Sequence, residues 1–180
     1  MKLLALDSSG LVASVAIVDD GITIAEYTVN YKKTHSQTLL PMLDEIKRMT
    51  ELDLHTIDAI AAGPGSFTGL RIGAATAKGL GLALEIPIIP VPTVDSLAYN
   101  LYGSDKLICP LMDARRNQVY TGLYTFRSGK EGGTGFEMCV LQKQCVVDIA
   151  EIIQQINALG TEVIFLGDGV DAYRGKIAEL

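Results

Sequence analysis

The stretch Leu3-Leu4-Ala5-Leu6-Asp7-Ser8-Ser9-Gly10 sets the start of the fold, because four apolar residues run directly into a polar turn. The next apolar run, 12–18, ends at Asp19-Asp20-Gly21. Asp-Gly between two apolar runs is a strong signal for a tight hairpin. A third run, 22–29, follows at once. These segments predict a three-stranded antiparallel meander.

After residue 34 the apolar residues change to helical spacing. Leu39, Leu43 and Ile46 fall three or four positions apart, which places them on one face of a helix. Thr34 and Gln37 fit a capping box, so we expect this helix to begin near residue 35. The pattern then predicts strands at 57–62 and 87–91 and helices at 68–84 and 93–102.

The rest of the chain repeats this order. The pattern predicts strands at 107–112, 119–126, 136–140 and 163–166, and helices at 147–159 and 172–180. The first order is β-β-β-α-β-α-β-α and the second is β-β-β-α-β-α, so we expect an internal repeat whose second copy lacks its last strand and helix. The expected lobes are residues 1–102 and 103–180. Two such lobes describe the α/β architecture of actin-like ATPases, the ASKHA or ribonuclease H-like fold.

Composition narrows the class of protein. The 180 residues are 48% hydrophobic and carry a net charge of −6, which disfavours a stand-alone nucleic-acid binder, since such proteins show a basic face. The three cysteines have no metal-site spacing and are interpreted as reduced thiols. No apolar run is long enough for a signal peptide or a membrane span. We therefore expect a cytoplasmic protein that is not bound to a membrane.

Two polar turns are the candidate nucleotide-binding elements. In actin-like ATPases, hairpin turns of both lobes hold the phosphates. Asp7, Ser8 and Ser9 occupy the first such turn, and Asp113 occupies the second. A phosphate loop needs glycine close behind the aspartate so that backbone amides can approach the anion. Here Ala114 and Arg115 follow Asp113, which favours a vestigial site.

The alternative is a live ATPase or small-molecule kinase that binds Mg-ATP between the lobes, with Asp7 and Asp113 holding magnesium-bound water. A metal site of the zinc type is disfavoured, because His35 and His55 are the only histidines and neither has a partner at ligand spacing. No residue is predicted to be catalytic, since no histidine is paired with a candidate nucleophile.

Small residues recur along the helix at 68–84. Gly69, Gly73, Ala77 and Gly81 are four residues apart and form a smooth stripe on one face. Glycine weakens a helix, so this stripe indicates close approach of another backbone. The approaching element is either a partner subunit or the protein's own sheet. For the partner, the candidate interface consists of Leu39, Leu43, Ile46, Gly69, Leu70, Gly73, Ala77 and Gly81.

Several blocks of the sequence resemble one family. The most specific is Gly63-Pro64-Gly65-Ser66-Phe67-Thr68-Gly69-Leu70-Arg71-Ile72-Gly73, and 4–9, 35–41, 92–97 and 112–116 match as well. Together they are similar to the bacterial TsaB family, also called YeaZ. The similarity runs through essentially the whole chain in the right order, although members usually continue for several more elements.

The resemblance implies a role in making N6-threonylcarbamoyladenosine on tRNA. In that pathway TsaD transfers the threonylcarbamoyl group, TsaE is an associated ATPase, and TsaB is the non-catalytic relative of TsaD. TsaB binds TsaD, and also itself, through the helices of its first lobe. TsaD-like proteins carry His-x-x-x-His in the third helix, whereas residues 92–98 contain no histidine. The resemblance thus implies no cofactor here, ATP and metal in the partner subunits, and contact with tRNA only through the complex.

Overall fold

The computed structural model describes residues 1–31, 34–63, 67–129 and 135–179, with the side chains of 67, 68 and 70 outside the description. The chain divides into two compact units, Met1–Thr93 and Val94–Leu180. Each unit contains one mixed sheet, and each sheet places its first strand between the second and fourth.

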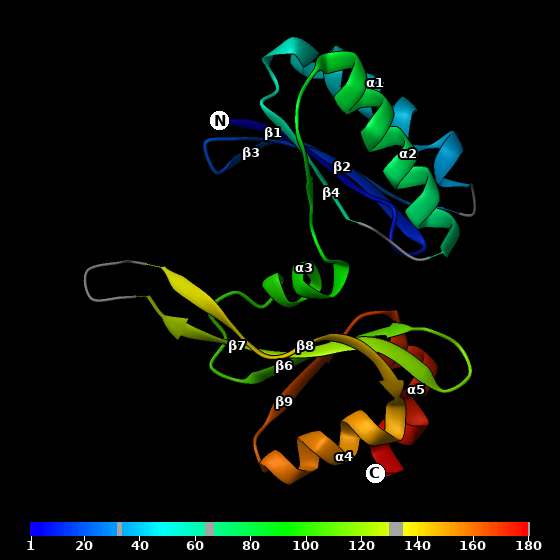
Figure 1. Cartoon of the computed structure of the whole chain (residues 1–180), viewed down its shortest axis with the longest axis vertical. Helices are drawn as coiled ribbons and strands as arrows, with labels where there is room; N and C mark the ends of the chain where they lie inside the picture. The colour runs from blue at the N-terminus through cyan, green and yellow to red at the C-terminus, as the bar shows by residue number, and fades with distance from the viewer. Residues whose placement is uncertain (32–33, 64–66, 130–134, 180) are drawn as a thin grey trace. The chain divides into compact units, whose positions relative to one another are not determined.

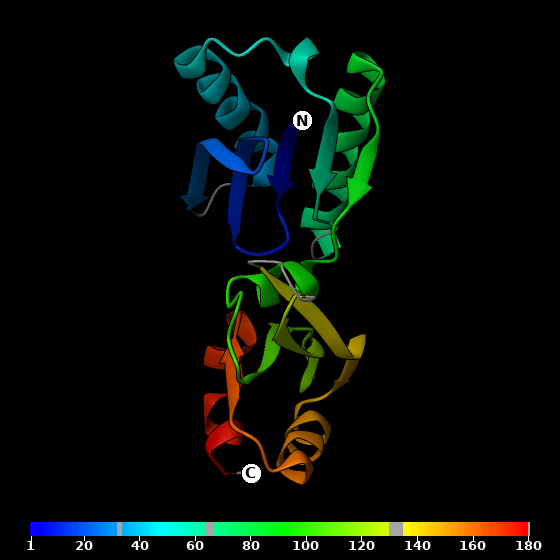
Figure 2. The same ribbon diagram turned by 90° about the vertical axis from the view of Figure 1, so that its left-hand side faces the viewer.

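The first unit contains a five-stranded sheet of order β3-β2-β1-β4-β5. Strands β1 to β3 are antiparallel, which confirms the predicted meander, and β4 and β5 join in parallel. Both long helices cover one face of this sheet (Figures 1 and 2). The elements are β1 (Lys2–Asp7), β2 (Val12–Asp19), β3 (Ile22–Asn30), η1 (His35–Gln37), α1 (Leu39–Thr50), η2 (Leu54–Thr56), β4 (Ala59–Ala62), α2 (Phe67–Leu84) and β5 (Ile88–Pro90).

The core of the first unit forms where the sheet meets these helices. Alternate residues of β1 and β2 point toward the helices and are buried, as a half-covered strand requires. Helix α1 contributes the opposite layer. The main buried residues of the two layers are Leu4, Leu6, Val15, Ile17, Leu39, Met42, Leu43 and Ile46.

The second unit repeats the first. Its four-stranded sheet has the order β8-β7-β6-β9, with β6 to β8 antiparallel and β9 parallel to β6. Helices α4 and α5 pack on one face and α3 on the other (Figure 1). The elements are α3 (Thr93–Tyr99), β6 (Leu107–Asp113), β7 (Gln118–Ser128), β8 (Phe136–Asp148), α4 (Ile149–Leu159), β9 (Val163–Leu166) and α5 (Asp168–Glu179). The actin-like fold and its internal repeat are confirmed.

The boundary between the units differs from the expected one. It falls between Thr93 and Val94 rather than after residue 102, so nearly all of α3 belongs to the second unit. The reason is packing, because Val94 and Ala98 are buried in a cluster with Tyr124 of β7. The Tyr124 hydroxyl also donates to Oδ1 of Asp95 at 2.6 Å.

Several element ends also differ. The capping box was wrong, because the Thr34 side chain makes no cap hydrogen bond and α1 begins only at Leu39. Strand β8 continues to Asp148, since β7 pairs with it along its whole length. Helix α3 ends at Tyr99 and α5 begins at Asp168, so α3 is shorter and α5 longer than predicted.

Candidate functional site

The turn after β1 is closed by its own hydrogen bonds. Oδ1 of Asp7 accepts the backbone N–H of Ser9 at 2.6 Å, which ties the carboxylate to the turn. The Ser8 side chain is buried, and its Oγ donates to the carbonyl oxygen of Gly69 in α2 at 3.0 Å. Ser8 therefore holds α2 against the turn and does not point to a ligand.

Helix α2 passes very close to this turn. A Cβ on Gly69 would lie 2.0 Å from the carbonyl oxygen of Ser8, and one on Gly73 would lie 2.5 Å from Oγ of Ser8. A Cβ on Gly63, which follows β4, would lie 3.0 Å from a carboxylate oxygen of Asp7, which is a less severe contact. Glycine is required at position 69, because a side chain there would clash with the backbone of the turn, whereas at positions 63 and 73 it would meet the side chains of Asp7 and Ser8.

His35 supports the same turn from the other side. Its Nε2 lies 2.8 Å from the carbonyl oxygen of Gly10, and its ring lies next to Gly69. His35 belongs to the 3-10 turn η1 rather than to the start of α1. The pattern of apolar residues could not reveal this contact, since a single histidine near a helix start carries no signal for a partner 25 residues away.

The turn after β6 is closed more completely. Oδ1 of Asp113 accepts the Tyr173 hydroxyl at 2.8 Å and the backbone N–H of Arg115 at 2.8 Å. The Arg115 guanidinium lies 3.2 Å from Oδ2. The Tyr173 hydrogen bond is the main cause that lowers the pKa of Asp113, and the contacts with Arg115 add to it. Burial and the neighbouring carboxylate raise the pKa of Tyr173.

The two turns share one local design. Asp7 and Asp113 each end a first strand, and each accepts the N–H of the residue two positions later. At the second turn, Oδ1 of Asp168 accepts the backbone N–H of Asp113 at 3.2 Å. The contacts of Asp168 and Tyr173 with Asp113 were not predicted from the sequence, although the internal repeat could have placed α5 beside Asp113 as α2 stands beside Asp7.

Apart from Leu70, the candidate interface residues are buried in the first unit. Leu39, Leu43 and Ile46 are 1–3% exposed and pack in the cluster between helix and sheet. The side chain of Leu70 lies outside the described residues. The three α1 residues therefore belong to the core of the first unit.

The stripe itself packs along the sheet from end to end. Gly69 and Gly73 contact Ser8, and Ala77 is buried in the core. A Cβ on Gly81 would lie 3.0 Å from Ile88 of β5. The close backbone approach that the glycines indicated is thus an approach of α2 to β1 and β5 within one unit.

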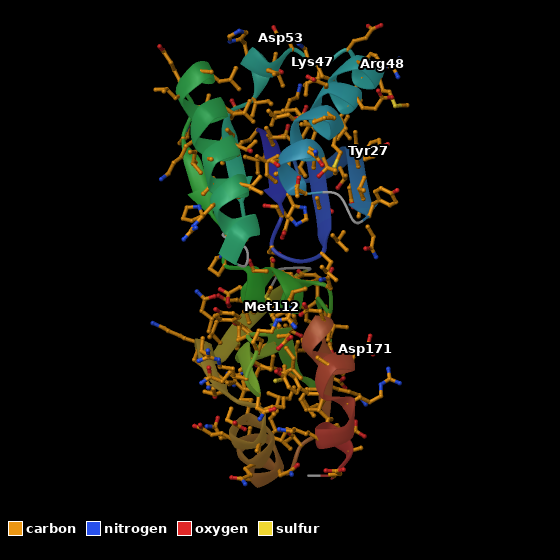
Figure 3. The ribbon with its side chains drawn as sticks, turned by 90° about the vertical axis from the view of Figure 1, so that its right-hand side faces the viewer. Tyr27, Lys47, Arg48, Asp53, Met112 and Asp171 are labelled. Carbon is orange, nitrogen blue, oxygen red and sulfur yellow. The ribbon has the colours of Figure 1, made fainter. Side chains whose placement is uncertain are left out.

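The opposite face of α2 carries a second set of small residues. Ala75, Gly79 and Ala83 are exposed and also four residues apart. A Cβ on Gly79 would meet nothing within 4 Å, and Leu82 beside it is 83% exposed. Helix α1 lies next to α2 on the same face of the sheet (Figure 3). Its outward residues include Leu40, Asp44 and Lys47.

Within residues 1–31, 34–63, 67–129 and 135–179, no three His, Cys, Asp or Glu side chains are grouped so that they could hold a metal ion. No helix in those same ranges combines the length and apolar character needed to cross a membrane.

Comparisons with known proteins identify the family. A family model described as TsaD, tRNA N6-adenosine threonylcarbamoyltransferase, matches residues 23–178. The chain is 35% identical over 187 residues to the tRNA threonylcarbamoyladenosine biosynthesis protein TsaB of Bacillus subtilis, covering 100% of this chain and 76% of that protein. TsaB of Escherichia coli is 36% identical over 129 residues, covering 69% of this chain and 55% of that protein.

A solved structure agrees with these relatives. A crystal structure of a Pseudomonas aeruginosa protein described as similar to peptidase YeaZ superposes with a TM-score of 0.82 and 29% identity, covering 98% of this chain and 79% of that one. The alignment with the Escherichia coli protein spans about half of that protein's length. The TsaD family model covers residues 23–178, and the 35% identity with the Bacillus protein extends over the whole of this chain and 76% of that protein, so the chain belongs to the TsaB (YeaZ) family.

Proposed function

We propose that this chain is a non-catalytic subunit in the biosynthesis of N6-threonylcarbamoyladenosine on tRNA, and that it acts by binding TsaD through the outward faces of α1 and α2. When TsaD is absent, the same faces join two copies of the chain. TsaE associates with the larger complex. The pathway is supported by the TsaB relatives, whose names state that role.

The observation that carries the proposed interface is the outward stripe of α2. Ala75, Gly79 and Ala83 leave the helix backbone open to solvent, and Leu82 is 83% exposed beside them. Small residues let the axes of two packed helices approach closely, because side chains set the interaxial distance. An exposed leucine beside such a surface supplies apolar area for an interface.

Charged residues border this surface. Asp44 and Lys47 lie on the exposed side of α1, and Lys78 lies on the exposed side of α2. A mostly apolar centre with a polar rim is the usual anatomy of a specific protein interface. The proposed interface thus still consists of α1 and α2, but it uses their exposed faces and not the buried faces that carry the predicted residues.

The two closed turns support the absence of catalysis in this chain. The Ser8 hydroxyl is hydrogen-bonded to the carbonyl oxygen of Gly69. The Asp113 carboxylate accepts hydrogen bonds from the Tyr173 hydroxyl and the backbone N–H of Arg115. Side chains that are held by their own polypeptide are poorly placed to hold magnesium and phosphate. We therefore assign ATP and metal to the partner subunits.

The proposal is tested by adding bulk to the outward stripe. Gly79→Leu fills the open face of α2 and should abolish or strongly weaken the complex with TsaD, measured by light scattering after size exclusion and by calorimetry. The same change should raise the Tm of the isolated chain at a concentration at which both proteins are monomeric, because leucine stabilises a helix interior relative to glycine by about 0.8 kcal/mol.

Gly175→Leu is the matched control. Gly175 is an exposed glycine in helix α5, and a Cβ there also meets nothing within 4 Å. This variant should leave TsaD binding unchanged. If Gly79→Leu is folded, is more stable than the wild type and binds TsaD with unchanged affinity, the proposed interface is wrong.

A further inference from the structure

The turn between β6 and β7 has an unusual backbone. Arg115, Arg116 and Asn117 all have positive φ, at 67°, 54° and 63°. This left-handed region is unfavourable for residues that carry a side chain, and less so for asparagine than for arginine. Three such residues in succession therefore make a turn that the surrounding structure must hold in place.

The fold does not require this strain. The equivalent turn of the first unit, Ser8 to Leu11, joins β1 to β2 and has the same length of four residues. None of its residues has a positive φ. The internal repeat thus offers an unstrained turn of equal length, so the left-handed turn with two arginines is particular to the second unit.

Three elements lock the strained turn. The Asp113 carboxylate accepts a hydrogen bond from the backbone N–H of Arg115. The hydroxyl of Tyr173 in α5 donates a second hydrogen bond to the same carboxylate. The N–H of Ile149, the first residue of α4, donates to the carbonyl oxygen of Asn117 at 2.9 Å. The turn is therefore rigid before any partner arrives, which lowers the entropy cost of binding.

The locked turn presents two guanidinium groups to solvent. The Arg115 side chain is 87% exposed, and among the described residues its ion pair is the contact with Asp113 within the turn. Arg116 is also exposed, and no salt bridge of Arg116 is found in the part of the chain that the structure describes. The guanidinium fork matches phosphate oxygens in a bidentate manner.

We propose that the Arg115–Arg116 turn contacts the phosphodiester backbone of the RNA substrate once the chain is part of its complex. This inference rests on the proposed function, in which that substrate is a tRNA. The net charge of −6 prevents strong binding by the chain alone. Two phosphate contacts on a rigid turn instead help to fix the register of the RNA, as phosphate contacts generally do.

The test measures the salt dependence of RNA affinity. A fluorescent tRNA transcript is titrated with the chain–TsaD complex over a series of salt concentrations, and the Arg115→Gln/Arg116→Gln variant is compared with wild type. Each lost phosphate contact should lower the slope of log affinity against log salt by about 0.7–0.9. The control is Arg127→Gln, which removes an exposed arginine of β7, outside the turn. This variant should leave the slope unchanged.

Assembly is measured separately, by size exclusion with TsaD. An unchanged slope in an assembled variant complex overturns the inference, and so does weaker TsaD binding with unchanged RNA affinity, which would make the turn a protein contact. If wild type fails to bind TsaD, the proposed function fails. The inference then fails as well, because it requires the assembled complex, whereas an unchanged slope in an assembled variant complex overturns the inference alone.

Discussion

The Tyr173 hydroxyl lies 2.8 Å from Oδ1 of Asp113 and donates a hydrogen bond to it, joining residues 60 positions apart. The contact connects α5 to the end of β6 and lowers the pKa of Asp113. It also occupies the carboxylate oxygen that sequence analysis assigned to a vestigial nucleotide site. The turn after β6 thus connects α5 to the sheet, and the stabilisation from this contact depends on the charge of Asp113.

Tyr173→Phe should remove this donor and destabilise the chain by about 1 kcal/mol at neutral pH. Because the folded-state pKa of Asp113 is lowered, the stabilisation is complete above the unfolded-state pKa of about 3.9 and is lost as pH falls through the folded value. Urea denaturation at neutral and acid pH measures both free energies of unfolding. A difference between the proteins that stays constant into acid pH would contradict this account.

Mg-ATP at millimolar concentration should leave the Tm of the chain unchanged in a thermal shift assay. A ligand that binds only the folded state raises the Tm, so a missing shift reports missing affinity. The physical reason is that Asp113 and Ser8 are engaged by their own polypeptide. A shift that Asp113→Asn removes would instead support the alternative of an ATPase or kinase.

Two glycines of α2 should respond in opposite directions to the same substitution. Gly69→Ala places a Cβ 2.0 Å from the backbone oxygen of Ser8 and should cost about 3 kcal/mol or more. Gly79→Ala meets open space and should stabilise the helix by about 0.5–1 kcal/mol. Chemical denaturation of both variants measures the two changes in the free energy of unfolding. Equal changes would refute the assignment of the inner and outer faces of α2.

Tyr124→Phe should loosen α3 from the second unit. The Tyr124 ring is fully buried and its hydroxyl donates to Asp95 at 2.6 Å, so its loss leaves a partly buried carboxylate without this donor. We expect a cost of about 1–3 kcal/mol. Tyr120→Phe on the same strand is the control, because Tyr120 is 44% exposed, and it should change stability little. Hydrogen exchange of residues 94–99 locates the effect.

The three cysteines should differ in reactivity. Cys109 is fully buried in β6, and burial raises the pKa of its thiol to about 12, despite a hydrogen bond with Thr121 that opposes the rise. The thiolate is the reactive form, so Cys109 should resist a thiol reagent at pH near 8. Cys139 and Cys145 are half-buried and should react. Mass spectrometry of the labelled native protein counts the modified thiols, and labelling at Cys109 without unfolding would contradict the structure.

The order of elements could be predicted from the sequence because apolar periodicity is a local property. The run at 3–6, the turn at Asp20-Gly21 and the helical spacing after Leu39 each involve neighbouring residues, and all three appear in the structure. The repeat of that order determined the fold class. The motif blocks determined the family.

Contacts between distant segments could not be predicted in this way. Whether α3 joins the first or the second unit depends on the packing of Val94 and Ala98 against Tyr124, which no local pattern encodes. The partners of the two turn aspartates depend likewise on where α5 and the helix α2 come to lie. The hydrogen bond between Tyr173 and Asp113 was therefore not predicted, although the internal repeat indicated where α5 lies.

The two faces of α2 show most clearly what each level decided. The sequence by itself determined that small residues recur every fourth position, because composition and spacing are written in the chain. Both the stripe from Gly69 to Gly81 and that from Ala75 to Ala83 have this spacing. Only the tertiary structure decided which stripe faces inward, since the rotation of a helix about its axis is set by packing, here by the contact of Gly69 with Ser8.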